Sequence, residues 1–566
     1  MIIGIDLGTT NSLASVFENG KTVLIPNSLG SFLTPSVISL SESDEVLVGL
    51  AARERLSTHS DKTASVFKRY MGTNKQLPLG RKLFRPEELS SLVLRALKKD
   101  AEVFLGEKVE GAIITVPAYF SDAQRKATRI AGELAGLRVD GLLNEPTAAA
   151  LAYGLHTLSD ESKFLVFDLG GGTFDVSVLD LFDGVMEVRA STGDNFLGGE
   201  DFRNYIVEAF IDRIGKKNKL PTEDQKLMGI IRNQAEIAKR TLTEMNFAEM
   251  KVNWKEETYS MNISIDEFNH WIEPLLLRLR KPVERALRDS KIKSSELDQI
   301  VLAGGATRML AVRKMVAKMF GIMPTSNLNP DEIVALGAGV QAGLKMKNSE
   351  LKEIVLTDVC PYTLGIEVSE RIGRDHKPGF YLPIIERNTI VPVSRSEIVN
   401  CIQDNQREMH VRIFQGESRL VKDNIFLGDV TVKFPPLPAS EASAEVRFTY
   451  DMNGILEVEV HVLPTNEKYR SIIEENPGVL TQEEIAEKLK RLEKLKIHPR
   501  DKEENRAVLS RAERLYEESL GEIRQFIGEE ISLFVGALDT QDSHLIAEAN
   551  KRLTKVLQNL EGDVYI

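Results

Sequence analysis

The chain has little of what marks secreted, membrane-embedded or disulfide-rich proteins. Its 566 residues include only two cysteines, Cys360 and Cys401, too few for a disulfide framework or a cysteine-based metal site. No apolar run approaches the ~18 residues that a membrane span needs. Residues 1–20 lack the basic and apolar regions of a signal peptide. We therefore expect a protein of the reducing cytoplasm, with no membrane as a partner.

Basic residues are also in short supply. Lys and Arg number 72 against 84 Asp and Glu, which gives a formal net charge of −12. Because nucleic-acid-binding proteins normally carry a basic excess or a basic face, no nucleic-acid partner is expected. A chain of 566 residues exceeds what one core supports, and its 42% hydrophobic and 28% charged residues are ordinary globular values. Two or more folded domains are therefore expected.

Three sequence patterns follow one another along the chain. Up to about residue 347, strands alternate with helical stretches, as where "GAIITVPAYF" precedes "SDAQRKATRIAGELAG", which predicts an α/β architecture. From about 360 to 470 strands dominate, and "AEVRFTYDM" and "LEVEVHV" flank the hairpin signal Asn453-Gly454. Further on, Thr481 and Glu484 form a capping box, and a helical pattern resumes after Pro499. Its spacing is too irregular for a sustained coiled-coil heptad.

Two short turns carry an acid, glycines and hydroxyl residues at the ends of Val/Ile-rich strands. They read "DLGTTNS" from Asp6 and "DLGGGTFD" from Asp168. Backbone N–H groups in such turns converge on phosphate oxygens, and glycine lets a phosphate approach closely. A carboxylate there would repel phosphate, so we expect it to hold a cation or its waters, typically Mg²⁺. The recurrence predicts two related lobes that clamp a triphosphate, without the P-loop, whose motif the sequence lacks.

Longer motifs extend these two turns into a family pattern. In chain order they read "GIDLGTTNS", "VPAYFSDAQR", "NEPTAAALAYG", "FDLGGGTFDVSVL", "LGGEDF", "GGATR" and "NPDEIVALGAGVQA". Together they closely resemble the Hsp70 chaperone family, and the shortened C-terminus looks most like the short bacterial HscC kind. The resemblance implies an actin-like ATPase domain of duplicated, ribonuclease H-like lobes (1–352), an interdomain linker (353–358), an antiparallel β-sandwich that binds peptide (359–475) and a short α-helical lid (476–566).

The resemblance also assigns roles in the nucleotide cleft. Asp6 and Asp168 match the acids that organise Mg²⁺ through water, with K⁺ often nearby in this family. The catalytic positions, which favour hydrolysis by positioning and charge stabilisation without a covalent intermediate, are Lys68, Glu145, Asp168, Thr173 and Asp175. The phosphate-binding positions are Gly8, Thr9, Thr10, Asn11, Gly170, Gly171, Gly172 and Thr173. Further nucleotide-binding positions are Gly198, Gly199, Glu236, Lys239, Arg240, Thr243, Gly304, Gly305, Arg308 and Asp331.

Two of the adenosine positions depart from the family pattern. Thr243 stands where the family has serine and keeps the hydroxyl, whereas Ala306 replaces a serine and removes one contact. Arg308 is expected to stack on adenine through its planar guanidinium. The nucleotide is therefore expected to be ATP or ADP.

Coupling between the domains is implied by the same resemblance. Pro117 and Arg125 match a proline switch and its partner, and Asp358 ends the apolar linker "EIVLTD". In the family this linker docks on the ATPase domain in one nucleotide state, ATP binding opens the β domain, and hydrolysis closes it. The positions that match the peptide slot and its rim are Ile366, Ser369, Val399, Ile402, Met409 and Val411. Val399 replaces a phenylalanine and Met409 a valine, which predicts a more pliable pocket.

Partners follow from the resemblance, with some departures. The family implies unfolded or hydrophobic polypeptide segments and a J-domain co-chaperone. Gly141 stands where a family arginine contacts the J-domain, which predicts a dedicated or altered J-protein. Shorter loops near Gly72–Phe84 and Asn246–Asn253 leave the contact with a nucleotide exchange factor open. The short lid predicts fast peptide exchange even with ADP bound.

Two other classes of protein share the duplicated phosphate clamp. One is a sugar or metabolite kinase, and the other is an actin-like filament or structural nucleotide switch. Neither needs a peptide-binding β domain after a linker, so residues 359–470 argue against both. The sequence therefore favours an ATP-dependent chaperone whose slow ATPase serves as a switch.

Overall fold

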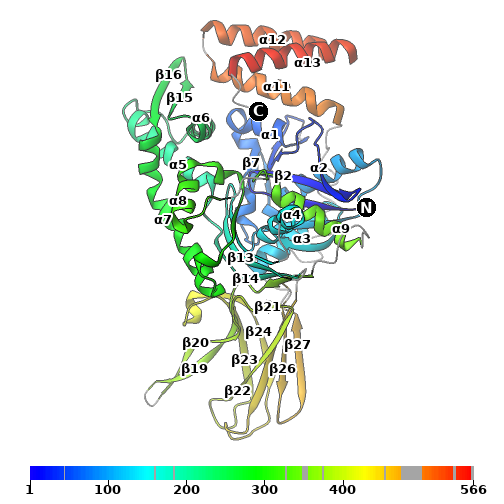
Figure 1. Ribbon diagram of the computed structural model, residues 1–566, viewed down its shortest axis with the longest axis vertical. Helices are drawn as coiled ribbons and strands as arrows, with labels where there is room; N and C mark the ends of the chain where they lie inside the picture. The colour runs from blue at the N-terminus through cyan, green and yellow to red at the C-terminus, as the bar shows by residue number, and fades with distance from the viewer. Residues whose placement is uncertain are drawn as a thin grey trace.

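Two α/β lobes lie between a β domain at one end of the molecule and a group of C-terminal helices at the other (Figure 1). The computed structural model describes residues 1–43, 45–157, 161–182, 185–324, 328–346, 355–372, 375–451, 454, 456–472, 500–519, 521–539 and 543–561. The arrangement fits the expected order of a two-lobed ATPase, a β domain and a helical C-terminal region.

The first lobe is built on a sheet with the strand order β11-β10-β1-β2-β3. β1 (Ile2–Asp6) is parallel to β10 (Gly111–Val116), which is parallel to β11 (Arg138–Asn144). β2 (Asn11–Glu18) and β3 (Lys21–Ile25) run antiparallel to their neighbours. The rest of the lobe comprises β4 (Thr34–Pro35), β5 (Val37–Leu40), β6 (Val46–Val48), α1 (Leu50–Thr58), η1 (Ser60–Lys62), β7 (Thr63–Ser65), η2 (Phe67–Tyr70), β8 (Leu77–Leu79), β9 (Lys82–Phe84), α2 (Pro86–Leu105) and α3 (Asp122–Leu134).

The second lobe repeats this sheet. β12 (Glu161–Leu169) is parallel to β17 (Gln299–Ala303) and antiparallel to β13 (Phe174–Phe182), which pairs with β14 (Val185–Asp194). These strands take the places that β1, β10, β2 and β3 hold in the first lobe, so the two Gly/Thr turns occupy equivalent positions. The lobe also contains α5 (Gly199–Phe210), η3 (Ile211–Gly215), α6 (Gln225–Glu244), β15 (Phe247–Trp254), β16 (Glu257–Ser264), α7 (Ile265–Ser290), η4 (Ser294–Glu296), η5 (Gly305–Arg308) and α8 (Leu310–Phe320).

Two helices join the lobes at their base. α4 (Glu145–Thr157) packs against α9 (Ile333–Lys345) so closely that a Cβ at Gly337 would overlap the carbonyl oxygen of Ala148. Their buried residues, together with Phe164 and Val301 of the second sheet, form one apolar cluster. The two lobes therefore share one apolar cluster at these helices.

The two segments that the sequence presented as shortened loops contain strands instead. Residues 72–84 include the hairpin of β8 and β9, and residues 247–254 form β15, paired with β16 over its whole length. In β15 the alternate residues Ala248, Met250 and Val252 are buried against α6 and α7. This period of two is what a half-buried strand requires, so the expectation of loops was wrong here.

The linker continues the second-lobe sheet. β18 (Val355–Val359) lies parallel to β14 and antiparallel to β21 (Ile390–Val391), which belongs to the β domain. Residues 353 and 354 of the expected linker lie outside the described residues. One continuous sheet therefore connects the second lobe, the linker and the β domain.

The β domain consists of two four-stranded antiparallel sheets, β20-β19-β23-β24 and β22-β25-β26-β27. Their facing residues share one apolar core that includes Val446, Phe448 and Val458. The expected pairing of residues 443–450 with 456–462 is present, although Asn453 lies outside the described residues. The strands are β19 (Leu364–Ile372), β20 (Asp375–Ile385), β22 (Val393–Asn400), β23 (Glu408–Gln415), β24 (Ile425–Lys433), β25 (Ser443–Tyr450), β26 (Leu456–Val462) and β27 (Glu467–Ile472), with η6 (Val421–Asp423) between β23 and β24.

The C-terminal helices lie on the first lobe rather than on the β domain (Figure 1). They are α11 (Arg500–Glu518), α12 (Gly521–Asp539) and α13 (Ser543–Glu561), and they pack around Ala512, Phe534, Leu553 and Leu557. The helix expected from Thr481 lies outside the described residues. Within the described ranges, no helix is both long enough and apolar enough to cross a membrane.

Candidate functional site

The two Gly/Thr turns meet across the cleft. A Cβ at Gly171 would collide with Oγ1 of Thr10, and one at Gly172 would lie 2.6 Å from Cγ2 of Thr9. The N-terminus of α5 completes this floor, because a Cβ at Gly198 would lie 2.5 Å from the backbone N of Gly172. Three backbone segments thus approach one another where no side chain fits. We call this floor the cradle, and its glycines leave the backbone open to the close approach that a phosphate needs.

Carboxylates line the base of the cradle, where Asp168 and Asp175 are buried and Asp6 is half-buried. Asp6 ends β1 and accepts a hydrogen bond of 2.9 Å from Thr115, while Asp168 and Asp175 are direct cross-strand partners on β12 and β13. Burial, with Glu145 second, raises the pKa of Asp6 to about 7 and that of Asp175 to about 7. Burial also raises the pKa of Asp168 well above its usual range. So many buried acids favour a bound cation.

One of these acids has a carboxylate oxygen without a partner in the protein. In the part of the chain that the structure describes, no three His, Cys, Asp or Glu side chains are arranged as direct ligands of one metal ion. Asp175 Oδ2 is buried and has no hydrogen-bond partner in the protein, so it is available to a water or an ion shell. Asp6 and Asp168 therefore suit the expected role of organising Mg²⁺ indirectly.

A buried ion pair lies beside these acids. Lys68, on η2, donates from Nζ to Oε1 of Glu145, the first residue of α4, at 2.7 Å, and both side chains are buried. The Lys68 charge lowers the pKa of Asp6, Asp168 and Asp175 against the effect of burial. The expected catalytic residues are thus brought together, with Thr173 in the turn that joins β12 and β13.

Arg69, which the sequence did not single out, contacts the same floor. Its Nε donates to the carbonyl oxygen of Gly172 at 2.9 Å, and its guanidinium pairs with Asp201 of α5. The side chain thereby ties the first lobe to the second beside the cradle. Its place next to Lys68 was the only signal in the sequence.

The helix α6 carries the first half of the expected adenosine set. Glu236 pairs with Lys239 at 2.8 Å and with Arg240 at 3.0 Å. Although burial raises the pKa of Glu236, Lys239 and Arg240 lower it to about 2. Lys239 also donates to the carbonyl oxygen of Gly199 at 3.1 Å, while Thr243 donates to the carbonyl oxygen of Lys239.

The turn after β17 carries the second half of that set. Gly304 has a φ of 79°, a conformation that favours glycine, and a Cβ at Gly305 would lie 2.5 Å from Oδ1 of Asp331. Arg308 pairs with Asp331 at 2.8 Å. A Cβ at Gly199 would meet Ala306 at 3.4 Å, so both halves converge on the start of α5.

A chain of hydrogen bonds runs from the cleft to the linker. Asp175 accepts from the backbone N of Tyr119 at 2.9 Å, in the turn that Pro117 opens. Beyond that turn, Arg125 donates to Oδ1 of Asn144 at 2.7 Å, and Nδ2 of Asn144 donates to Asp358 at 2.6 Å. The three expected switch residues therefore lie along one path.

Contacts between the ATPase lobes and the β domain were missed by sequence reasoning. Tyr362 packs on Tyr119 with ring centroids 4.2 Å apart and donates to its carbonyl oxygen at 2.8 Å. Arg387 binds Asp289 of α7 with two hydrogen bonds, of 2.8 and 3.1 Å. These residues are isolated in the sequence, and no motif marks them.

The expected peptide-slot residues gather in the β domain, far from the cleft (Figure 1). Ile366 and Val411 are buried, whereas Val399 and Met409 are half-buried beside the same apolar core. The rim positions differ from these: Ser369 is half-buried near the end of β19, and Ile402 is 46% exposed. Gly141, the departure linked to the J-domain, is half-buried on β11 and faces Ile113.

Comparisons with known proteins agree with this geometry. The Hsp70 protein family matches residues 2–79 and 75–565 of the chain. Chaperone protein DnaK of Mycoplasmopsis pulmonis is 41% identical over 99% of this chain and 90% of its own. DnaK of Ureaplasma urealyticum is 39% identical over 99% and 94%, and that of Thermotoga neapolitana is 40% identical over 86% and 82%. Since these relatives are DnaK proteins, the finer likeness to the HscC kind stays a prediction.

Membership in this family implies a biochemical activity and a set of partners. Hsp70 proteins are ATPases that bind nucleotide with Mg²⁺, unfolded polypeptides and J-domain co-chaperones. The match runs through the linker and the β domain, which a sugar kinase or an actin-like filament protein would not share. The chain therefore belongs to the Hsp70 family and is an ATP-dependent molecular chaperone.

Proposed function

We propose that ATP is hydrolysed in the cleft between the lobes by positioned charges, and that the described arrangement is the ATP form of the chaperone. The observation that carries the first part is the buried Lys68–Glu145 pair beside Asp6, Asp168 and Asp175. In that role the turn residues 8–11 and 170–173 hold the phosphates, and the residues of α6, η5 and the α5 N-terminus hold the adenosine.

Each catalytic residue has a task that its surroundings support. Lys68 is held by Glu145 and stabilises the negative charge that develops on the transferred phosphoryl group. Asp175, with one oxygen fixed by Tyr119 and the other free of protein partners, orients the attacking water. Mg²⁺ supplies charge neutralisation of the phosphates when bound at Asp6 and Asp168, and K⁺ is proposed nearby. No covalent intermediate is needed.

The docked linker supports the assignment of the ATP form. β18 is paired on both edges, and the half-buried Asp358 accepts a hydrogen bond from Asn144, so the linker is tied to the ATPase lobes. The described helices of the C-terminal region lie on the lobes and leave the β domain uncovered (Figure 1). We propose the domain boundaries 1–352, 353–358, 359–475 and 476–566 and the short HscC-like character on the same basis.

Peptide affinity, measured with and without ATP, tests both the position of the peptide slot and its coupling to ATP. Val399→Phe enlarges a half-buried side chain in the slot, so affinities across a panel of short apolar peptides should change about 3- to 10-fold. Ile398→Phe is the matched control, since Ile398 is 63% exposed on the other face of β22. Fluorescence anisotropy with and without ATP measures both. Peptides that stay bound when ATP is added would contradict the coupling, and unchanged affinities in Val399→Phe would contradict the slot.

A dedicated J-protein is proposed from Gly141. A Cβ there would meet only the end of the Ile113 side chain, at 3.2 Å, so a side chain at Gly141, as in Gly141→Arg, requires a small shift of Ile113. The added arginine is expected to raise the affinity for a generic J-domain about 10-fold, because a charged contact is restored. Asp140→Arg, at the neighbouring bulge position of β11, is the control. Surface plasmon resonance measures the effect, and tight binding of the generic J-domain to the unmodified chain would argue against a dedicated partner.

The compartment follows from the two thiols. Cys360 and Cys401 are both free and buried, and burial raises the pKa of the Cys360 thiol to about 12. Such thiols are unreactive and need no oxidising surroundings. We therefore place the protein in a reducing compartment, the cytoplasm.

A further inference from the structure

The two ATPase lobes touch at the end of the cleft that lies farthest from the β domain. There α1 of the first lobe and α6 of the second are in direct contact. A Cβ at Gly229 of α6 would lie 2.7 Å from the carbonyl oxygen of Leu56 and 3.1 Å from Cα of Ser57. We call this contact the crown seam. Since the lobes enclose the nucleotide, the crown seam must open when the lobes move apart.

The helix α11 lies across the crown seam. One stripe of α11, formed by Ala507, Ser510, Arg514 and Glu518, is buried. These residues are spaced by three or four positions and so share one helix face. α11 packs along α1 and reaches β15 of the second lobe. A single helix from the C-terminal region therefore contacts both lobes.

The contact with the first lobe is tight and dry. Arg514 Nε donates to Oε2 of Glu54 at 2.6 Å, and the two side chains are only 4% and 3% exposed. Arg506 adds a second pair with Glu45, also at 2.6 Å. A buried ion pair of this kind is costly to separate, because each charge would be left without its partner.

The contact with the second lobe is polar. Glu518 accepts from Arg514 at 2.9 Å and from Nδ2 of Asn233 at 3.3 Å, and its backbone carbonyl accepts from Asn253. Its neighbour Glu517 pairs with Lys226 at 2.6 Å. The chain Glu54–Arg514–Glu518–Asn233 thus runs from one lobe to the other through α11.

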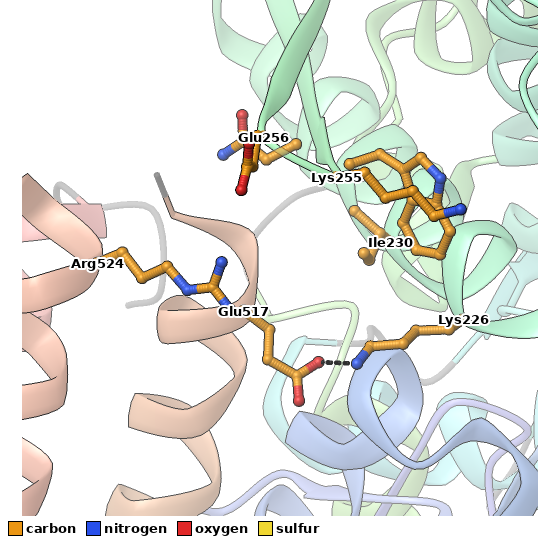
Figure 2. Close-up of a pocket in the computed structure, with 8 residues that line it drawn as sticks. Lys226, Ile230, Lys255, Glu256, Glu517 and Arg524 are labelled. Atoms are coloured by element: carbon orange, nitrogen blue, oxygen red, sulfur yellow. Dashed lines mark ion pairs between the residues drawn. The ribbon is translucent and has the colours of Figure 1, made fainter. Parts of the chain in front are cut away.

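A cavity of about 590 Å³ lies beside this second contact (Figure 2). Figure 2 shows Glu517 and Lys226 paired at its base, with Arg524 of α12 opposite and Lys255 and Glu256 at the tip of the β15–β16 hairpin. The lining also includes Trp254, whose indole nitrogen has no hydrogen-bond partner in the protein. The free space, the charged side chains and the unpaired indole N–H of Trp254 favour bound water in this cavity. Separating α11 from the second lobe therefore costs less free energy than separating it from the first lobe.

We infer that α11 is a strap across the crown seam, which holds the nucleotide cleft shut while the C-terminal helices are docked and lets nucleotide leave faster once its second-lobe contacts part. The coupling is reciprocal, because a ligand that closes the cleft must also favour docking of α11. Release of the helices and release of nucleotide are then parts of one equilibrium. This goes beyond the proposed hydrolysis and peptide switch, since neither requires that α11 reach the second lobe.

The strap predicts faster nucleotide release when its second-lobe half is removed. Lys226→Ala/Asn233→Ala deletes two contacts to α11 and touches no residue of the nucleotide site, so dissociation of a fluorescent ATP analogue should accelerate about 3- to 10-fold. Lys216→Ala/Asn218→Ala is the matched control in the same lobe, where Lys216 pairs with Asp212 and Asn218 donates to Ile214. Arg514→Ala removes the contact with Glu54 and the support of Glu518, so it weakens the contacts of α11 with both lobes. It should accelerate nucleotide release at least as much.

Trp254 reports docking in the same samples. In a Trp271→Phe background it is the only tryptophan, and departure of α11 exposes it to more water and shifts its emission to longer wavelength. The expected result is a red shift in Arg514→Ala together with faster release. A red shift with unchanged release would overturn the strap, and so would unchanged emission, which would show that α11 is not docked there. Normal nucleotide binding by the unmodified chain keeps either failure separate from a failure of the ATPase proposal.

Discussion

Lys68→Met is expected to lower kcat for ATP hydrolysis by about 10²- to 10³-fold while changing nucleotide affinity only several-fold. Lys68 lies among four acids, of which Glu145, Asp168 and Asp175 are buried, and it is held by Glu145 at 2.7 Å. A fixed charge aimed at the developing negative charge acts more strongly in the transition state than in the bound state, and losing one such group typically costs this much. Single-turnover hydrolysis and equilibrium nucleotide titration separate the two quantities.

Stability must be measured in the same variant, because the substitution leaves Glu145 buried without its cation. That change alone costs about 3 to 5 kcal/mol of unfolding free energy in comparable buried pairs. Lys68→Met/Glu145→Gln removes the uncompensated charge, and Lys75→Ala, an exposed lysine over Tyr70, is the control. If the double variant regains both stability and hydrolysis, Lys68 has only a structural role.

The pH profile gives an independent readout of the same residue. Burial raises the pKa of Asp175 to about 7, and Lys68 lowers it from the higher value that burial alone would produce. Hydrolysis needs the charged carboxylate, so activity falls as the pH drops through this pKa. In Lys68→Met the pKa rises further, and the residual activity should therefore be lost at a higher pH than in the unmodified chain.

The approach of the two Gly/Thr turns could be predicted from the sequence because each turn is short and contiguous, whereas the nucleotide roles of their residues stay predictions. The turns after Asp6 and Asp168 bring their own glycines, hydroxyls and acids, so the local sequence determines both the conformation and the ligand chemistry. The alternation of strands and helices likewise indicated the α/β lobes, and Asn453-Gly454 indicated the pairing of β25 with β26. In each case neighbouring residues carry the information.

What could not be predicted are contacts between residues far apart in the chain. Arg514 meets Glu54, and Arg387 meets Asp289, through the packing of whole domains, and a single charged residue carries no periodicity that reveals its partner. The docking of α11 on the lobes has the same origin, since its buried stripe would suit any apolar or small-residue surface. Residues 247–254 show a related limit, because a length difference alone did not distinguish a loop from the paired strand β15.

Removing the Arg387–Asp289 contact is expected to weaken the docked arrangement of the β domain about 10- to 30-fold. The guanidinium binds both carboxylate oxygens, at 2.8 and 3.1 Å, and Asn388 adds a hydrogen bond of 3.1 Å to the same carboxylate. Arg387 is 32% exposed, so solvent screening lowers the gain below that of a fully buried pair, and we expect about 1.5 to 2 kcal/mol. In Arg387→Met, ATP should therefore release bound peptide more slowly and less completely.

A double-mutant cycle shows whether the two residues act together. Arg387→Met and Asp289→Asn should each impair ATP-driven peptide release, and the double variant should be little worse than either, because each removes the contact that the two residues share. Arg419→Met, which breaks the pair with Glu370 inside the β domain, should leave release unchanged. Although burial raises the pKa of Asp289, Arg387 lowers it below the usual value, so the carboxylate is charged throughout the neutral range. The effect should accordingly be the same at pH 6 and pH 8, and additive effects of the two substitutions would show that this contact does not couple the domains.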